Sequence, residues 1–121
     1  MRDHQNTRRL LKEDGSPVLE RLEVAESAWQ RMRGLLGRKG MPAGSGLLIR
    51  KCRAIHTIGM VFSIDLLFLD RDGVVLGRAE NVGPWSTAAG PRGTRSVLEM
   101  PAGELARLEI PDGTRLIASD S

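Results

Sequence analysis

Cysteine and aromatic residues are the scarcest components of this sequence. Its 121 residues include one Cys, two Trp, two Phe and no Tyr. A single Cys excludes an intramolecular disulfide, so nothing in the sequence indicates an oxidising compartment, and we expect a cytoplasmic protein. Few aromatic rings are available for stacking on unpaired bases, which argues against a surface for single-stranded nucleic acid.

Long hydrophobic runs are also missing. The longest apolar run, residues 64–69, is interrupted by Asp65, and charges are scattered through residues 1–17. Neither segment has the length of a membrane span or the pattern of a signal peptide. We therefore expect no membrane partner. With 40% hydrophobic residues the chain can still build a proper core.

The charge balance is mildly basic, with 18 Lys and Arg against 15 Asp and Glu. The densest basic cluster is formed by Arg50, Lys51 and Arg53. A solvated edge is the favoured interpretation of this cluster, and we do not expect nucleic acid as a partner. An interaction protein that binds nucleic acid or an acidic partner through this cluster is kept as an alternative.

Three Asp-Gly pairs, at residues 14–15, 72–73 and 112–113, lie between segments with strand-like composition. Asp-Gly suits the tight turns of antiparallel hairpins, because glycine readily adopts a positive φ. Three hairpins are therefore predicted, pairing residues 8–12 with 18–24, 64–69 with 74–78, and 106–110 with 115–118. Beyond Asp65, the strand at 64–69 is apolar on both sides, which is typical of a strand covered on both faces.

One helix is predicted over residues 27–36, where Ser27 and Gln30 form a capping-box pattern and apolar residues follow helical spacing. The sequence as a whole predicts a flexible tail at residues 1–7 and a single β domain at 8–118. The expected fold is mainly β, a compact antiparallel sandwich or barrel-like sheet with this one short helix packed on it.

Cys52, His56 and Met60 are spaced four residues apart and combine the ligand types of copper sites. Such a site needs a second imidazole, and the only other one is His4 in the N-terminal tail. Structural zinc needs four Cys or His ligands, which this chain does not have. We therefore expect no metal and no cofactor.

The presence of Cys52 near His56 also suggests nucleophilic catalysis, in which Asp65 would orient the imidazole. The favoured interpretation of Cys52 is a small buried hydrophobe, since free cysteines commonly pack in this way. A hydrolase or transferase that uses Cys52, or a His56 and Asp65 pair, is kept as the enzyme alternative.

Two carboxylates, Asp65 and Glu99, lie within apolar runs. A buried carboxylate must be paired, solvated or protonated, and we favour ion pairs with arginines such as Arg31 or Arg33 for both. His56 is interpreted either as a buried histidine held by one hydrogen bond or as a residue that contacts a ligand.

The leading functional hypothesis is a ligand-binding or accessory domain for a small molecule or a protein partner, neither of which the sequence identifies. Its pocket is expected near His56, Asp65 and Trp85, because polar residues gather there beside the buried strand. The expected ligand-binding residues are His56, Thr57, Met60, Asp65 and Trp85.

Several ordered motifs carry a resemblance to a known family. They include Arg31-x-x-Gly34-Leu35, Ile55-His56-Thr57, Met60, Ile64-Asp65, Pro84-Trp85 and Pro101-Ala102-Gly103. With these motifs the chain resembles the bacterial and archaeal domain of unknown function family 192, from the first predicted hairpin onward. The resemblance implies a mainly β sandwich or barrel with a small helical element, a shared site at His56, Thr57, Met60 and Asp65, and no established activity.

Overall fold

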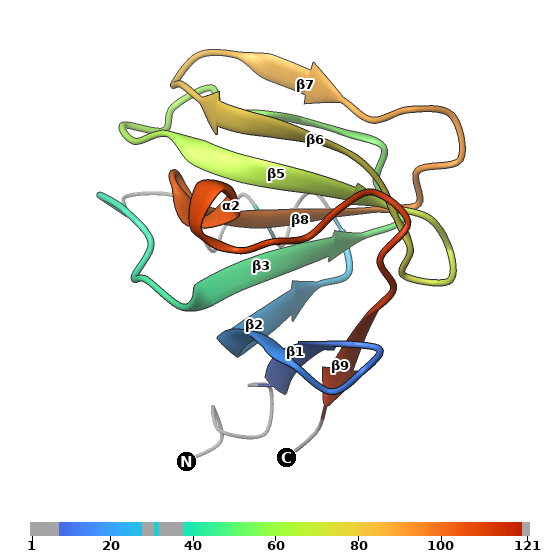
Figure 1. Ribbon diagram of the computed structural model, residues 1–121. Coiled ribbons are helices and arrows are strands. Elements are labelled where there is room, and N and C mark those ends of the chain that lie inside the picture. The colour runs from blue at the N-terminus through green and yellow to red at the C-terminus, as the bar shows by residue number, and fades with distance from the viewer. Residues whose placement is uncertain (1–7, 28–30, 32–37, 120–121) are drawn as a thin grey trace.

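The computed structural model describes residues 8–27, 31 and 38–119, and about half of them belong to β-strands (Figure 1). The strands are β1 (Arg8–Lys12), β2 (Pro17–Ala25), β3 (Ser45–Arg50), β4 (Ala54–His56), β5 (Ile64–Leu69), β6 (Val75–Val82), β7 (Thr87–Ala89), β8 (Ser96–Pro101) and β9 (Leu116–Ser119). Helix α2 spans Glu104–Arg107. The predicted mainly β fold is confirmed.

Seven strands form one sheet in the order β6-β5-β8-β3-β2-β1-β9, and β4 pairs with β7 in a separate two-stranded sheet. The first two predicted hairpins are confirmed, because β1 pairs with β2 and β5 pairs with β6, both antiparallel. The large sheet is mixed rather than purely antiparallel, since β2 and β3 run parallel. Every residue of β5 is buried, as its two-sided apolar pattern predicted.

The third predicted hairpin is wrong. Residues 104–107 form helix α2, and β9 pairs with β1 at the edge of the sheet. The segment Glu104-Leu105-Ala106-Arg107 consists of strong helix formers, and Asp65 on β5 accepts hydrogen bonds from the N–H groups of Gly103 and Leu105 at 3.0 Å each. A capping group from a distant strand thus decides the conformation of this segment.

The two edges of the large sheet approach each other without closing a barrel among the described strands. Val74, just before β6, forms an isolated bridge with Arg115, just before β9. The N–H of Leu116 donates to the Gly73 carbonyl at 2.9 Å, and the N–H of Val75 donates to the Thr114 carbonyl at 2.9 Å. We call this short contact between the edges the seam.

Each face of the sheet carries its own apolar core. The helix-side core contains Leu67, Leu98 and Met100 together with Leu105 of α2. The loop-side core contains the residues that alternate with these on β5 and β8, namely Ile64, Leu66, Phe68 and Val97. They pack against Ile55 of β4 and Met60 of the loop that follows it. Side chains therefore reach opposite faces at successive positions of β5 and β8.

The helix predicted over residues 27–36 lies largely outside the described residues. Arg31 is helical there, and its N–H donates to the Ser27 carbonyl at 3.1 Å. The predicted tail at residues 1–7 also lies outside the described part. Among the residues that the structure describes, no helix is long and apolar enough to span a bilayer.

Candidate functional site

Thr57 joins the two loops that carry most of the predicted site residues. Its N–H donates to the Ser86 carbonyl at 2.8 Å, while its hydroxyl donates to the Gly83 carbonyl at 2.7 Å and accepts the N–H of Ser86 at 2.8 Å. Its carbonyl accepts the N–H groups of Met60 and Trp85, both at 3.1 Å. Thr57 is fully buried. These bonds fix residues 57–61 and 83–86 as one structure, which we call the tip.

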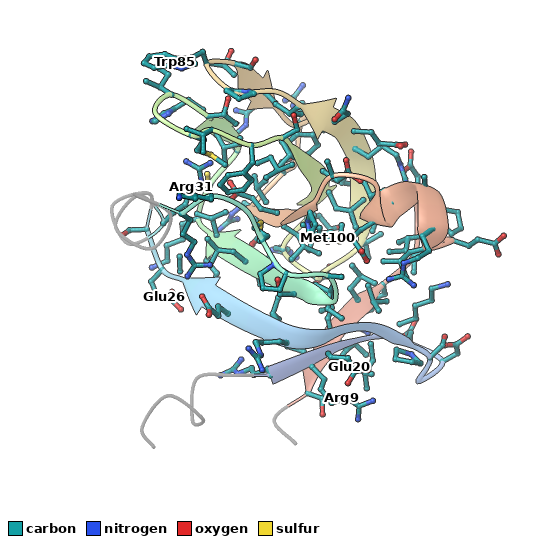
Figure 2. The ribbon with its side chains drawn as sticks, turned by 90° about the vertical axis from the view of Figure 1, so that its left-hand side faces the viewer. Arg9, Glu20, Glu26, Arg31, Trp85 and Met100 are labelled. Atoms are coloured by element: carbon teal, nitrogen blue, oxygen red, sulfur yellow. The ribbon has the colours of Figure 1, made fainter. Side chains whose placement is uncertain are left out.

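Three large apolar side chains of the tip project into solvent. Trp85 is 71% exposed, Val61 69% and Ile58 53%. Figure 2 shows Trp85 at the end of the molecule opposite Arg9 and Glu20. Trp85 was predicted to border a pocket, and here it stands on a protruding surface. Its ring therefore does not shield the end of the sheet.

Trp85 also has an unusual backbone conformation, with a φ of 59°. A non-glycine residue in this left-handed region is destabilised by about 1–2 kcal/mol. The hydrogen bond from Trp85 N–H to the Thr57 carbonyl holds this conformation. The fold thus maintains a strained backbone at Trp85, which has the most exposed large apolar side chain in the described part of the chain.

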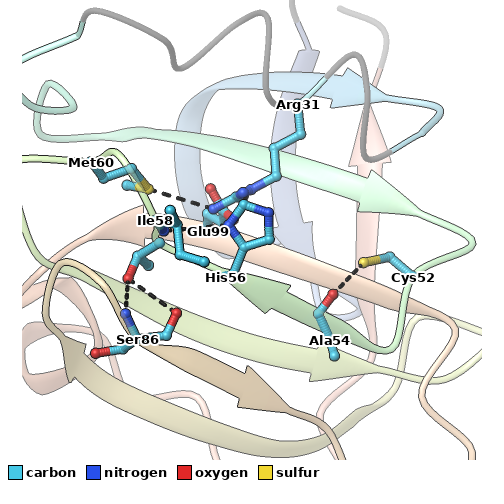
Figure 3. A network of polar contacts seen from close by, with 9 residues as sticks. Arg31, Cys52, Ala54, His56, Ile58, Met60, Ser86 and Glu99 are labelled. Atoms are coloured by element: carbon cyan, nitrogen blue, oxygen red, sulfur yellow. Dashed lines mark hydrogen bonds and ion pairs between the residues drawn. The ribbon is translucent and has the colours of Figure 1, made fainter.

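A buried ion pair lies beneath the loop that contains Met60 (Figure 3). Arg31 Nε donates to Glu99 Oε2 at 2.5 Å, and the two side chains are 6% and 0% exposed. Arg31 Nη2 lies 3.5 Å from the Met60 sulfur. The predicted ion pair of Glu99 is confirmed, and it shows that Glu99 faces the loop-side core.

The second oxygen of Glu99, Oε1, is buried without a hydrogen-bond partner among the described residues. Burial raises the pKa of the Glu99 carboxyl above its ordinary value, and the charge and hydrogen bond of Arg31 only partly offset this effect. The carboxyl can therefore take up a proton or accept one further hydrogen bond inside the protein.

His56 ends β4 and is half-buried, and its Nδ1 accepts the N–H of Ile58 at 3.3 Å. The thiol of Cys52 donates to the Ala54 carbonyl at 3.0 Å and packs beside the loop-side core. The hydrogen bond of the thiol thus goes to a carbonyl rather than to an imidazole. The thiol thus packs against the core, but Cys52 is half-buried rather than buried as expected.

Asp65 is 1% exposed and serves the fold. Its carboxylate accepts the N–H groups of Asn81 at 2.8 Å and of Gly103 and Leu105 at 3.0 Å. Leu105 belongs to the helix-side core, whereas His56 is flanked by residues of the loop-side core. The expected pocket shared by His56 and Asp65 is therefore corrected: Asp65 binds backbone groups on the other face, not an arginine among the described residues.

Comparison with known proteins assigns the chain to a family. The family model DUF192, Uncharacterized ACR, matches residues 9–118. The chain belongs to the DUF192 family. The family expected from the sequence motifs is thus confirmed, and no curated protein matches this DUF192 chain.

Solved structures share the fold of this DUF192 domain. A candidate transcription regulator from Sinorhizobium meliloti is 28% identical with a TM-score of 0.78, over 93% of this chain and 92% of its own. A protein of unknown function from Novosphingobium aromaticivorans is 25% identical with a TM-score of 0.72, over 92% and 83%. A candidate exported protein from Burkholderia pseudomallei shares only the fold, at 17% identity and a TM-score of 0.51, over 93% and 24%.

The structure of this DUF192 domain thus brings together four of the five predicted site residues, namely His56, Thr57, Met60 and Trp85. Sequence reasoning missed Ile58 and Val61, the other exposed apolar side chains of the tip. The signal was present, because Ile58 and Val61 lie on either side of the Gly59-Met60 pair, in a short segment with a turn residue. Among the described residues no three His, Cys, Asp or Glu side chains gather as metal ligands would.

Proposed function

We propose that this DUF192 chain is an accessory domain that binds a partner protein through its tip. In this proposal the exposed side chains of Ile58, Val61 and Trp85 enter an apolar cleft of the partner. Thr57 holds the two loops together, His56 accepts the N–H of Ile58, and the buried side chain of Met60 anchors the tip in the loop-side core.

The exposure of Trp85 in a strained backbone is the observation that carries the proposal. Strained residues persist only where the surrounding structure enforces them, and they are concentrated at functional sites. The Thr57 bonds provide this enforcement. A tryptophan that serves the fold alone would be expected to bury its ring, whereas this ring is 71% exposed.

The shape of the tip favours a protein over a small molecule. Small molecules are usually enclosed in concave sites, while Trp85 protrudes at one end of the molecule (Figure 2). Tryptophan is also enriched among the few residues that dominate the binding free energy of protein interfaces. The ion pair of Arg31 and Glu99 provides a rigid base on which such a surface can be held.

A peptide library displayed on phage tests the proposal directly. The purified wild-type chain is the bait, and selected peptides are measured by titration against Trp85→Ala, Val61→Ala and Ile117→Ala. Ile117 is an exposed apolar residue on β9, outside the tip, and serves as the matched control. We expect apolar peptides whose Kd rises at least about 30-fold for Trp85→Ala, the change typical of an interface hot spot.

Two results would overturn the proposal. One is a library that yields no peptide above background. The other is a set of peptides that bind Trp85→Ala and the wild type equally, since the tip would then not be the binding surface.

Nucleic acid is the second candidate partner, because one relative is described as a candidate transcription regulator. Within the described residues, however, the longest helix has four residues, too short to act as a recognition helix in a major groove. Retention on double-stranded DNA that falls steeply with salt would favour this candidate over a partner protein.

A further inference from the structure

A groove of about 300 Å³ opens beside the seam, away from the tip. The tip adjoins the start of β5 and the end of β6, whereas the groove lies at the opposite end of this hairpin, next to Asp70 and Gly73. It is on the face of the sheet that carries the helix-side core, beyond the part covered by α2. The groove exists because β9 and β6 meet only at the seam, which leaves the interior of the curved sheet open at this end.

Leucine side chains from six strands form the apolar floor of the groove, and Ser96, Ile117 and Ala118 lie beside them. The leucines are Leu10, Leu22, Leu48, Leu69, Leu98 and Leu116. All are buried except Leu48, which is half-buried and packs against the same core. These leucine side chains offer a hydrocarbon chain favourable contacts and cannot form hydrogen bonds with a polar ligand.

The rim of the groove carries three exposed guanidinium groups, those of Arg50, Arg71 and Arg115. Arg50 Nε is 3.8 Å from Glu26 Oε1, and Arg115 Nη1 is 3.4 Å from Glu13 Oε2. Both pairs are largely exposed, so their mutual attraction is weak and screened by solvent.

Arg71 differs from the other two arginines, because no ion pair of Arg71 is found in the described part of the chain. Two carboxylates also lie on the rim. Asp70 accepts the N–H groups of Asp72 and Val74, at 2.8 and 3.0 Å, and is thus occupied by its own turn. Asp72 is exposed. The lining thus has three guanidinium groups against two carboxylates, and the pairs of Arg50 and Arg115 with carboxylates outside it are weak and exposed, which favours an anionic group at the mouth.

From this arrangement we infer that the groove binds a single-chain anionic amphiphile of the fatty-acid class. The acyl chain lies on the leucine floor, and the carboxylate lies among Arg50, Arg71 and Arg115. The volume is at the lower limit of ligand pockets, so the groove accepts one chain of medium length rather than a two-chain lipid. This inference is independent of the partner proposed for the tip.

Calorimetric titration with octanoate, decanoate and decanol, below their aggregation concentrations, tests the inference. We expect the Kd to fall about fourfold for each added methylene that enters the groove. Decanol should bind at least about tenfold more weakly than decanoate, because a charge-assisted hydrogen bond to arginine is lost. Equal binding of the alcohol and the carboxylate would overturn the assignment of the headgroup.

Two variants locate the site, each with a matched control. Arg71→Gln should raise the Kd of decanoate several-fold and leave the Kd of decanol unchanged. Arg92→Gln, at an exposed arginine outside the groove, should change neither Kd. Ala118→Trp should block the groove at an exposed lining position, with Ala118→Ser as its control.

Amide NMR spectra recorded during the decanoate titration should show shifts at residues 69–73 and 115–118. Shifts confined to the tip, or decanoate binding unaffected by Ala118→Trp, would overturn the inference. So would binding only to phosphatidylglycerol vesicles, because the ligand would then be a membrane surface rather than a free acid.

Discussion

Arg31 and Glu99 form an ion pair from which solvent is almost wholly excluded, with Nε and Oε2 separated by 2.5 Å. The pair joins the helical position of Arg31 to the middle of the large sheet, because Glu99 on β8 is paired with Leu47 of β3 and Leu66 of β5. Its second oxygen has no partner among the described residues. The free energy of unfolding therefore depends on whether the Glu99 carboxyl is protonated.

Replacing Glu99 by glutamine should lower the free energy of unfolding by about 1–3 kcal/mol, because the amide has one oxygen acceptor in place of two and turns an N–H donor into a buried site beside the Arg31 guanidinium. Urea unfolding followed by circular dichroism measures this change. Glu23→Gln, which removes an exposed pair with Arg38 at 3.8 Å, is the control and should change stability by less than about 1 kcal/mol.

The double variant Arg31→Met/Glu99→Leu should recover most of this loss, since apolar replacement of a whole buried pair is often neutral or stabilising. If the double variant is as unstable as Glu99→Gln, the ion pair stabilises the fold more than apolar side chains in the same positions do.

Glu99 should also give stability a defined pH dependence. Its pKa in the folded protein is raised above the ordinary value of 4.5, so between 4.5 and the raised pKa the folded state holds a proton that the unfolded state has released. The contribution is fully present below pH 4.5 and is lost as pH rises through the raised pKa. Urea titrations from pH 4 to 8 should therefore show the stability advantage of wild type over Glu99→Gln shrinking with rising pH; a constant or growing advantage would contradict the assignment.

Asp65→Asn should destabilise the fold by about 2 kcal/mol or more without affecting the tip. The carboxylate accepts three backbone N–H groups, and an amide in its place turns a donor toward some of them. Hydrogen exchange at the Leu105 amide should accelerate, while peptides selected on the tip keep their Kd. Asp72→Asn at an exposed position is the control, with an expected change within about 0.5 kcal/mol.

Trp85→Gly should be more stable than Trp85→Ala by up to about 1 kcal/mol, because glycine adopts the positive φ without strain. The same pair of substitutions at Ile58, whose φ is not in this region, should show the opposite order. Thermal unfolding of the four variants provides the comparison. If glycine is the less stable residue at both positions, the backbone of Trp85 is not strained.

Gly73→Ala should weaken the seam. A Cβ at this residue would lie 2.7 Å from the Leu116 carbonyl oxygen, in a backbone with a φ of 82°. Gly113→Ala is the matched control, because its φ is 93° and its Cβ would meet nothing within 4 Å. We expect a loss of about 1 kcal/mol at Gly113 from backbone strain alone and about 2–3 kcal/mol at Gly73. Equal losses measured by urea unfolding would show that the seam tolerates the methyl group.

Local patterns predicted the parts of the fold that depend on neighbours in sequence. The Asp-Gly turns at residues 14–15 and 72–73 were sufficient to predict two hairpins. The pair at 112–113 also lies in a turn, with the N–H of Thr114 donating to the Pro111 carbonyl at 3.1 Å. The strand predicted before this turn does not form, because the carboxylate of Asp65 caps a helix there. That carboxylate comes from a strand about 40 residues away, so no local pattern indicated it.

The candidate site was predicted in part for a similar reason. Alternation along β5 places Asp65 on the same face as Leu67, and alternation along β8 places Glu99 on the same face as Val97. No local pattern indicated which of these two faces is covered by the loop of His56 and Met60. The structure assigns that loop to the face of Glu99, so the carboxylate beneath it is Glu99 rather than Asp65.

By itself the sequence determined the family, the mainly β architecture and the central strand at residues 64–69, because turn chemistry and two-residue periodicity act over short distances. Only the tertiary structure decided that Trp85 protrudes, that Asp65 caps a helix and that leucines from six strands line one groove. These features depend on which face each loop covers and on how far the sheet curls, and both result from packing across the whole chain.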